Sequence, residues 1–241
     1  MPDLENLSFS KSAELHSFQG LLFDMDGTII DSTDAIVKHW HQIGNELGID
    51  PEVILQTSHG RRSIDVLEIY DKSKANMEYV SYIEGRLPRE YGQDAVEIPG
   101  SRELLEVLER RKIPWAIVTS GTRPLVAGWL DVMKLAHPKN LVTAEDVPHG
   151  KPDPTCYGLG QKSLGLPDHA PLLVLEDAPA GIKAGKAAGF KVVALATTHD
   201  VHHLREAGAD WIVRDMRSVS LQEWDEKTGE AKIQIIDALV S

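Results

Sequence analysis

The 241-residue sequence is poor in cysteine and in basic side chains, and it lacks long apolar runs. With Cys156 alone, no disulfide can form within the chain, which fits a reducing compartment. A net charge of −12 argues against a general nucleic-acid or anionic-membrane surface, because both need a basic patch. No apolar run approaches the ~20 residues of a membrane-spanning helix. We therefore expect no nucleic acid and no membrane among the partners.

The first 19 residues do not have the basic and apolar segments of a secretory signal peptide. We therefore expect a cytoplasmic protein, and we take a monomer as its expected state. Residues 1–18 are mixed polar and are expected to form a loose tail. Cys156 follows Pro154 near a predicted helix start without a visible activating environment, so it is expected to be inert rather than a nucleophile.

Short apolar runs alternate with helix-like segments along most of the chain. This alternation predicts an α/β fold, with a Rossmann-like doubly wound parallel sheet and helices on both of its faces. A terminal hairpin is expected over Leu221–Asp237, with its turn at Thr228 and Gly229. The predicted strands are Leu21–Phe23, Trp115–Val118, Leu141–Thr143, Leu172–Leu175, Val192–Leu195 and Trp211–Val213. The predicted helices are Ser101–Lys112, Arg123–Met133, Thr155–Leu164, Ala180–Ala188 and Val201–Ala207.

Residues 33–99 interrupt this alternation with helical patterns over Ala35–Leu47, Ile64–Tyr70 and Met77–Arg86. We predict that they form a small inserted α-helical cap domain, and that residues 19–32 and 100–241 form the catalytic core. Because the insertion follows the first strand, it would lie over the carboxyl edge of the sheet, where open α/β sheets bind ligands. Such a lid can exclude water on closure. The alternative is a long crossover connection, but connections of this length are rarely simple.

Two aspartates, Asp24 and Asp26, directly follow the first predicted strand and precede Gly27. The alternation of a strand would point both carboxylates to the same side. Two carboxylates at close range repel each other, so the pair needs a divalent cation or a shared proton. The alternative is an ordinary polar turn, which also favours Asp and Gly.

Two further segments carry polar groups: one directly follows a predicted strand, and the other lies in a loop. Thr119, Ser120 and Gly121 offer hydroxyl and N–H donors that suit a phosphate, although a helix N-cap is an equal alternative. Lys151 lies in a loop stiffened by Gly and Pro, which favours a functional lysine over an ordinary surface one. Such a lysine could neutralise a phosphate and a neighbouring carboxylate.

A third strand end carries the acids Glu176 and Asp177. Mg²⁺ prefers one or two carboxylates together with water and substrate phosphate. Asp177 is therefore a candidate oxygen ligand for Mg²⁺.

Together these four segments resemble the haloacid dehalogenase superfamily of phosphohydrolases, from Leu21 to about Val213. The resemblance implies that Asp24 is a nucleophile, that Asp26 is a general acid and base, and that Lys151 balances charge. It implies that Thr119, Ser120 and Gly121 bind the phosphate. It also implies a Mg²⁺ cofactor held by Asp24, Asp26, Glu176 and Asp177, with Asp26 contributing its backbone carbonyl.

Five segments more closely resemble the fungal glycerol-phosphate phosphatases and the related 2-deoxyglucose-6-phosphate phosphatases: Ser58–Arg62, Glu84–Pro88, Ile98–Gly100, Thr119–Arg123 and Glu176–Gly181. This resemblance implies a small phosphorylated polyol or sugar as substrate, with hydrolysis of glycerol phosphate expected first. The alternative is 2-deoxyglucose-6-phosphate or another small sugar phosphate. His59, Arg62 and Glu84 are candidate substrate-binding residues of the cap, because a polyol needs hydrogen-bonding partners. Each could instead be solvated or structurally paired.

Two other classes of protein would share the core motifs. A phosphomutase would recapture its phosphorylated product rather than release phosphate. A non-catalytic binding protein on the same fold would be expected to lack Asp24 or Lys151, and both are present. We therefore expect a phosphoric monoester hydrolase.

Overall fold

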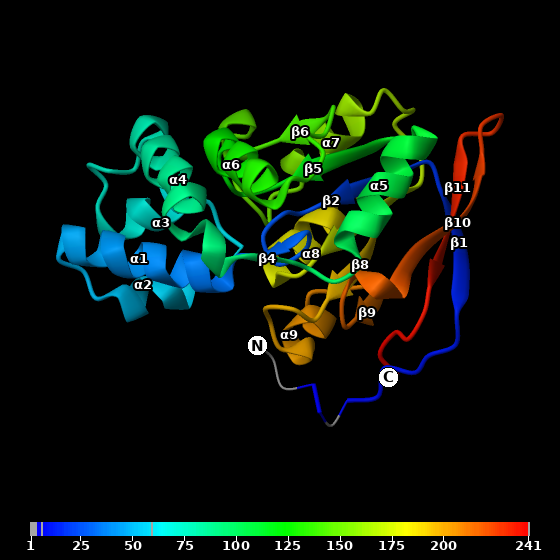
Figure 1. Cartoon of the computed structure of the whole chain (residues 1–241), viewed down its shortest axis with the longest axis horizontal. Helices are drawn as coiled ribbons and strands as arrows, with labels where there is room; N and C mark the ends of the chain where they lie inside the picture. The colour runs from blue at the N-terminus through cyan, green and yellow to red at the C-terminus, as the bar shows by residue number, and fades with distance from the viewer. Residues whose placement is uncertain (1–3, 6, 59, 241) are drawn as a thin grey trace.

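The computed structural model describes residues 4–5, 7–58 and 60–240. Figure 1 shows three parts: a central sheet layered with helices, a group of helices set to one side, and an elongated antiparallel sheet on the opposite side. Among the described residues, no helix combines the length and apolar character needed to cross a membrane.

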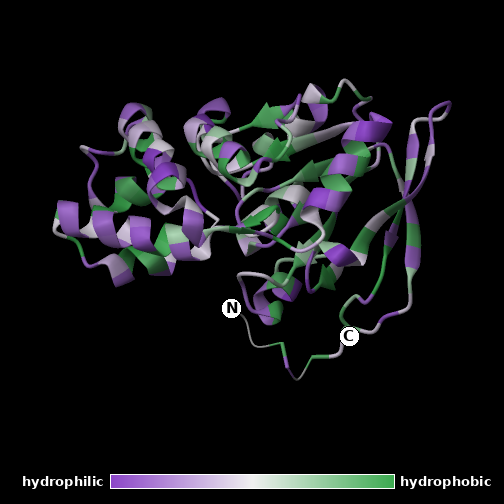
Figure 2. Cartoon of the chain, in the orientation of Figure 1, coloured by the Kyte–Doolittle hydropathy of each residue, from purple (hydrophilic) through white to green (hydrophobic). Residues whose placement is uncertain are grey.

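The central sheet has six strands, and every neighbouring pair in it is parallel. The strands are β2 (Gly20–Phe23), β5 (Trp115–Val118), β6 (Leu141–Val142), β7 (Leu172–Glu176), β8 (Lys191–Leu195) and β9 (Trp211–Val213). Their order is β6-β5-β2-β7-β8-β9, so β2 lies in the middle between β5 and β7. The strands are the most continuously hydrophobic segments in Figure 2, as expected of parallel strands buried on both faces.

Helices cover both faces of this sheet. Successive side chains of β2 point to opposite faces, and they join two different hydrophobic clusters. Leu21 and Phe23 belong to one hydrophobic cluster, and Leu22 belongs to the other. Side chains of α5 (Ser101–Arg111) and α6 (Arg123–Met133) join the first cluster. Those of α7 (Thr155–Ser163), α8 (Pro179–Ala187) and α9 (Val201–Glu206) join the second. The predicted fold class is confirmed, and the predicted strands of the central sheet and the helices on its faces differ from the observed ones by at most one residue at each end.

The helical group to one side consists of α1 (Thr33–Leu47), α2 (Pro51–Ser58), α3 (Ser63–Tyr70) and α4 (Met77–Tyr91). It has a hydrophobic cluster of its own, which includes Trp40, Ile54 and Val80. Helix α2 was not predicted, and α4 continues beyond its predicted end, with Pro88 inside it. The separate cluster supports the proposed division into a cap over residues 33–99 and a core, which stays a prediction.

Both segments that join the helical group to the core contain a short strand. β3 (Ile30–Asp31) pairs antiparallel with β4 (Val96–Glu97), so the two connections lie side by side. The short helical turns η1 (Gly92–Asp94), η2 (Ala144–Asp146) and η3 (Met216–Ser218) complete the helical elements.

The expectation of a loose tail over residues 1–18 is wrong for Glu14–Phe18, which form strand β1. β1 pairs antiparallel with β11 (Glu230–Ile235), and β11 pairs with β10 (Val219–Asp225), as the predicted terminal hairpin requires. β1 was missed because its partner, β11, lies more than 200 positions later in the chain. The alternation of exposed and buried residues in β1 also extends over only five residues. The hairpin was found because its turn signal is local, and Gly229 has the positive φ expected there.

Candidate active site

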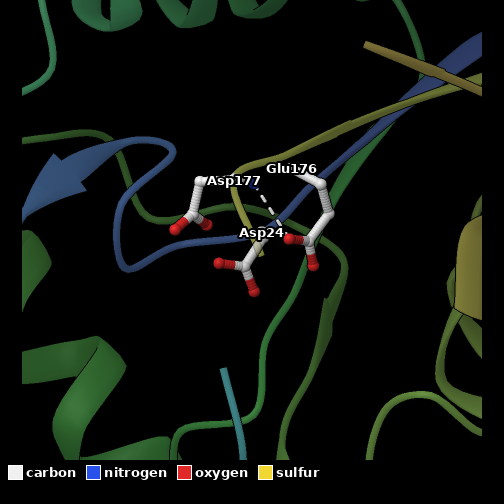
Figure 3. A group of neighbouring side chains, drawn as sticks. All are labelled: Asp24, Glu176 and Asp177. Carbon is white, nitrogen blue, oxygen red and sulfur yellow. Dashed lines mark hydrogen bonds between the residues drawn. The ribbon is translucent and has the colours of Figure 1, made fainter. Parts of the chain in front are cut away.

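Three acidic side chains meet at the carboxyl ends of β2 and β7. Asp24 directly follows β2, Glu176 ends β7, and Asp177 comes next. Because Phe23 pairs with Leu175 in the parallel register, the chain leaves both strands at the same level. Figure 3 shows the three carboxyl groups converging, and one oxygen from each lies within 4.8 Å of the others. All three residues are buried.

Lys151 lies among these acids and is itself buried. Its Nζ donates to Asp24 Oδ1 at 2.6 Å, to Glu176 Oε1 at 2.7 Å and to the Val118 carbonyl at 3.1 Å. Burial alone would lower the pKa of Lys151, but the Asp24 and Glu176 carboxylates outweigh burial and raise its pKa well above the ordinary value. The structure thus brings together Asp24, Lys151 and Glu176, which the sequence places far apart.

Glu176 uses both of its carboxylate oxygens within the protein. Oε1 accepts from Lys151 and from the Tyr157 hydroxyl at 3.0 Å, and Oε2 accepts the backbone N–H groups of Asp177 and Ala178, both at 2.9 Å. These hydrogen bonds hold the Glu176 carboxylate in place, and the carboxylate in turn orients the ammonium group of Lys151. Tyr157 was missed from the sequence, since a tyrosine within a predicted helix carries no signal of a tertiary partner.

Asp177 is held by hydroxyl groups. Thr28 donates to Oδ1 at 3.2 Å, and Thr198 donates to Oδ2. Burial first, then the nearby Glu176 and Asp24, raise the pKa of Asp177 well above its usual range. Gly27 has φ +83°, and a Cβ there would lie 2.2 Å from Asp177 Oδ2. Only glycine therefore allows the loop after β2 to pass so close to this carboxylate.

Asp26 lines the same cavity as Asp24 and remains partly exposed. The hydroxyl of Ser32 donates to Asp26 Oδ1 at 2.6 Å. Burial raises the pKa of Asp26, whereas the Ser32 hydrogen bond opposes this shift. An upward shift of this pKa favours the protonated form that a general acid needs.

The site carries more buried negative charge than Lys151 can balance. Burial raises the pKa of Asp24, Lys151 lowers it, and Glu176 raises it again, with a net increase. A divalent cation would relieve this repulsion, and carboxylate oxygens are the ligands that Mg²⁺ prefers. The donor set therefore fits a hard cation. Asp24, Glu176 and Asp177 each offer a carboxylate oxygen to such a cation, and Glu176 is the most heavily hydrogen-bonded of the three, with four donors within the protein.

The predicted phosphate-binding residues lie at the adjacent strand end. Thr119, Ser120 and Gly121 follow β5 and line the cavity with Asp24. The Gly121 N–H donates to Thr119 Oγ1 at 3.0 Å, and the Ser120 hydroxyl donates to the carbonyl of Gly60 in the helical group at 3.1 Å. This segment thus contacts both the reaction centre and the residues above it.

Of the three predicted cap residues, Glu84 lines the cavity. It accepts the Ser63 hydroxyl on Oε1 at 2.5 Å and the backbone N–H of Thr122 on Oε2 at 2.7 Å. Burial, which outweighs these two hydrogen bonds, raises the pKa of Glu84 from 4.5 to about 7. A carboxylate from α4 therefore accepts the backbone N–H of the residue that directly precedes the core helix α6.

Arg62 does not line this cavity. Its guanidinium donates to the carbonyl of Val147 at 2.8 Å and to that of Pro148 at 3.2 Å, and it forms two hydrogen bonds with Asp65. Arg62 thereby joins the helical group to a core loop. His59 lies outside the described residues.

The cavity that these residues enclose is small, with a volume of about 90 Å³. Since a water molecule needs roughly 10–15 Å³ in this measure, the cavity has room for only a few small groups. Its floor carries Asp24, Asp26 and Lys151, and its roof comes from the helices α1, α2 and α4.

A central parallel sheet with helices on both faces and buried acids at its carboxyl edge is a Rossmann-like fold, and this arrangement is found in a family of hydrolases. Residues 21–195 match the haloacid dehalogenase-like hydrolase family, and the chain belongs to this family. It is thus an enzyme, and the relatives below are named for phosphatase activity.

The chain is similar to two groups of phosphatases from Saccharomyces cerevisiae. It is 40% identical to glycerol-1-phosphate phosphohydrolase 1, in an alignment that covers 90% of each chain. It is 37% identical to 2-deoxyglucose-6-phosphate phosphatase 1, over 83% of this chain and 89% of that one. Among solved structures, a hydrolase from Pseudomonas syringae matches with a TM-score of 0.71 and 28% identity, covering 82% of this chain and 94% of the other. The predicted resemblance is confirmed.

Proposed function

We propose that this enzyme is a Mg²⁺-dependent phosphomonoesterase that hydrolyses glycerol phosphate to glycerol and phosphate through an aspartyl-phosphate on Asp24. The observation that carries the proposal is the cavity of about 90 Å³, with Asp24 and Lys151 at its floor and polar side chains at its roof. The small volume of this cavity favours a small phosphomonoester. The 40% identity to a glycerol-1-phosphate phosphohydrolase over most of both chains supports glycerol phosphate as that substrate.

In the first step, an Asp24 carboxylate oxygen attacks the phosphorus in line while the bond from phosphorus to the leaving alcohol oxygen breaks. Asp26 donates its proton to that oxygen, and glycerol leaves. In the second step, Asp26 removes a proton from water, which attacks the aspartyl-phosphate and releases phosphate and the Asp24 carboxylate. Lys151 keeps Asp24 oriented and balances the charge on the transferred group.

Mg²⁺, held by Asp24, Asp177 and the backbone carbonyl of Asp26, would supply the positive charge that lets an anionic nucleophile approach an anionic phosphate. Thr119, Ser120 and Gly121 line the cavity with Asp24, which supports their proposed role as donors to the phosphate oxygens. Glu84 is positioned to contact the alcohol part of the substrate. Arg62 is better described as a residue that docks the cap on the core, because its donors are engaged there.

The second candidate is 2-deoxyglucose-6-phosphate or a related small sugar phosphate. The 37% identity to a 2-deoxyglucose-6-phosphate phosphatase favours it. The same mechanism would hydrolyse both candidate substrates. They differ only in the alcohol part that the roof of the cavity must accommodate. The substrate is proposed to be a small phosphomonoester in either case.

The test is phosphate release, with and without Mg²⁺, from both glycerol phosphates, 2-deoxyglucose-6-phosphate, glucose-6-phosphate and a nucleotide. We expect the highest kcat/KM for a glycerol phosphate, and activity that is lost in EDTA and restored by Mg²⁺. Asp24→Asn should reduce turnover by about 10⁴-fold or more, because the nucleophile is removed. The exposed Asp34→Asn is the matched control and should retain full activity.

Two results would contradict the proposal. Retained turnover in Asp24→Asn would exclude the aspartyl-phosphate. Activity that appears only when a sugar bisphosphate is supplied would indicate a phosphomutase instead.

A further inference from the structure

We propose that His39 and Ser58 form, together with Glu84, a subsite that binds the hydroxyl groups of the alcohol part of the substrate. This inference rests on the proposed function, because it assigns partners to the part of the same substrate that leaves as the free alcohol. The sequence did not single out His39, which lies within a predicted helix, and it marked Ser58 only as the first residue of the segment Ser58–Arg62.

The first observation is the position of the two residues. His39 lies on α1 and Ser58 ends α2, and both line the cavity that Asp24 and Lys151 also line. Their exposed fractions are only 4% and 6%. Two buried polar residues from separate helices therefore line one cavity together with Asp24 and Lys151.

The second observation is that their polar atoms are unpartnered. Within the described part of the chain, neither His39 Nε2 nor Ser58 Oγ has a hydrogen-bonding partner, although both atoms are buried. Buried polar groups in native proteins are nearly always hydrogen-bonded, and an exception calls for an explanation. A ligand that fills the cavity would supply the missing partners.

These two atoms differ from the other unpartnered buried atoms because their residues line the cavity. Buried atoms without a partner, again among the described residues, also occur in Asp94, Ser101, Thr122 and Trp129. None of these four residues lines the cavity, whereas His39 and Ser58 both do. The coincidence of missing partners and cavity position therefore points to ligand binding rather than to general packing defects.

The chemistry of the three side chains matches hydroxyl groups. Burial, and next the nearby Arg86, lower the pKa of His39 to about 4, so its imidazole is neutral at physiological pH. A neutral imidazole offers one donor and one acceptor, as a hydroxyl does. Ser58 can likewise donate and accept, and Glu84 adds carboxylate oxygens. A group of hydrogen-bonding side chains of this kind suits a polyol better than an apolar alcohol.

The experiment compares two substrates in the full-length enzyme at saturating Mg²⁺: glycerol phosphate and propyl phosphate, which has the same carbon chain without free hydroxyls. The variants are His39→Phe and Ser58→Ala, which remove the polar atoms with little change in volume. Ser101→Ala is the matched control, since it removes an equally buried and unpartnered hydroxyl outside the cavity. Thermal unfolding of each variant checks that it folds.

We expect kcat/KM for glycerol phosphate to fall by about tenfold or more in both cavity variants, mainly through a higher KM. The same variants should turn over propyl phosphate within about threefold of the wild type, and Ser101→Ala should be unchanged on both substrates. If His39→Phe does not fold, Ser58→Ala alone decides the question.

Equal losses on both esters, or no loss on either, would overturn the subsite while leaving the proposed function intact. A wild-type enzyme that hydrolyses neither ester would instead overturn the proposed function. If the wild type prefers 2-deoxyglucose-6-phosphate, a selective loss on that substrate supports the subsite, and an unselective one overturns it.

Discussion

Lys151 is the residue on which the charge balance of the reaction centre depends. It is buried between two carboxylates, and its ammonium group also reaches a backbone carbonyl. Removing one partner from a buried charge network leaves the others uncompensated, and this loss is typically much larger than the loss of an exposed ion pair.

We therefore expect Lys151→Met to lower the free energy of unfolding by about 3–5 kcal/mol in the absence of Mg²⁺, and to abolish phosphate release. Urea unfolding in EDTA measures the first effect. Lys191→Met is the matched control, because Lys191 forms an exposed ion pair with Asp210 at 2.8 Å and its loss should cost about 1 kcal/mol or less. Equal losses in the two variants would contradict the proposed charge balance.

Glu84 gives the enzyme a pH-dependent stability. Burial raises its pKa from 4.5 to about 7, so the folded protein keeps this proton at pH values where the unfolded chain has released it. The free energy of unfolding must therefore fall as the pH rises from about 4.5 to about 7, and change little from this source beyond that range.

We expect the stability of the wild type relative to Glu84→Gln to fall by about 3 kcal/mol between pH 4.5 and pH 7. Chemical unfolding of both proteins at a series of pH values measures this difference. Glu78→Gln, at an exposed position of the same helix, is the control and should follow the pH dependence of the wild type. A constant difference between wild type and Glu84→Gln would show that the carboxyl group is not protonated on folding.

The sequence indicated the residues of this site by local signals: an apolar strand before the acids and hydroxyls, and a loop stiffened by Gly and Pro around Lys151. Asp24, Thr119 and Asp177 lie at strand ends, where the sheet itself brings them together. Residues on helices gave no such signal. Tyr157 and His39 depend on which way a helix faces after packing, and a single sequence does not contain that information.

At the scale of elements, the contact between α4 and α6 joins the cap to the core through glycine and proline. A Cβ on Gly128 would lie 2.7 Å from Cγ of Pro88, and one on Gly85 would lie 3.0 Å from Cβ of Pro124. Each helix thus places a proline ring against a glycine of the other. The two backbones approach closely, with little room for any added atom.

We expect Gly128→Ala to push α4 away from α6 and to lower the free energy of unfolding by about 1–3 kcal/mol, because a proline ring cannot rotate out of the way. Thermal or urea unfolding, together with KM for the substrate, measures the effect. Gly158→Ala on α7 is the control, since a Cβ there meets no atom within 4 Å. That variant should be neutral or slightly stabilised, because alanine favours a helix over glycine. Similar destabilisation in both variants would contradict the close-packing argument.

Elements were predicted well where a local pattern and a local signal agreed. The strand Trp115–Val118 and the helix Arg123–Met133 were predicted to the residue, because apolar runs and turn residues delimit both. Helix α2 (Pro51–Ser58) was missed because it is short and only two of its residues, Ile54 and Ser58, are buried. β1 was missed because its stability comes from pairing with β11 rather than from its own sequence.

At the scale of the whole molecule, the alternation of strands and helices was enough to predict the sheet and its two helical layers. The helical insertion was recognised by the loss of that alternation. The contacts that dock it on the core were not predictable, because they join residues such as Arg62 and Val147 that are distant in sequence and carry no shared pattern. The closed cavity is a product of these contacts, and its volume follows from them.

The central position of β2 has a consequence for the synthesis of the chain. β2 is the first strand of the central sheet to be made, yet both of its neighbours, β5 and β7, come much later. On the ribosome, Leu21–Phe23 therefore emerge with both edges unpaired, followed by Asp24 and Asp26, long before Lys151 and Glu176 are translated. An unpaired apolar strand is prone to wrong association, so we expect the nascent chain to be most prone to aggregation until β7 has left the exit tunnel.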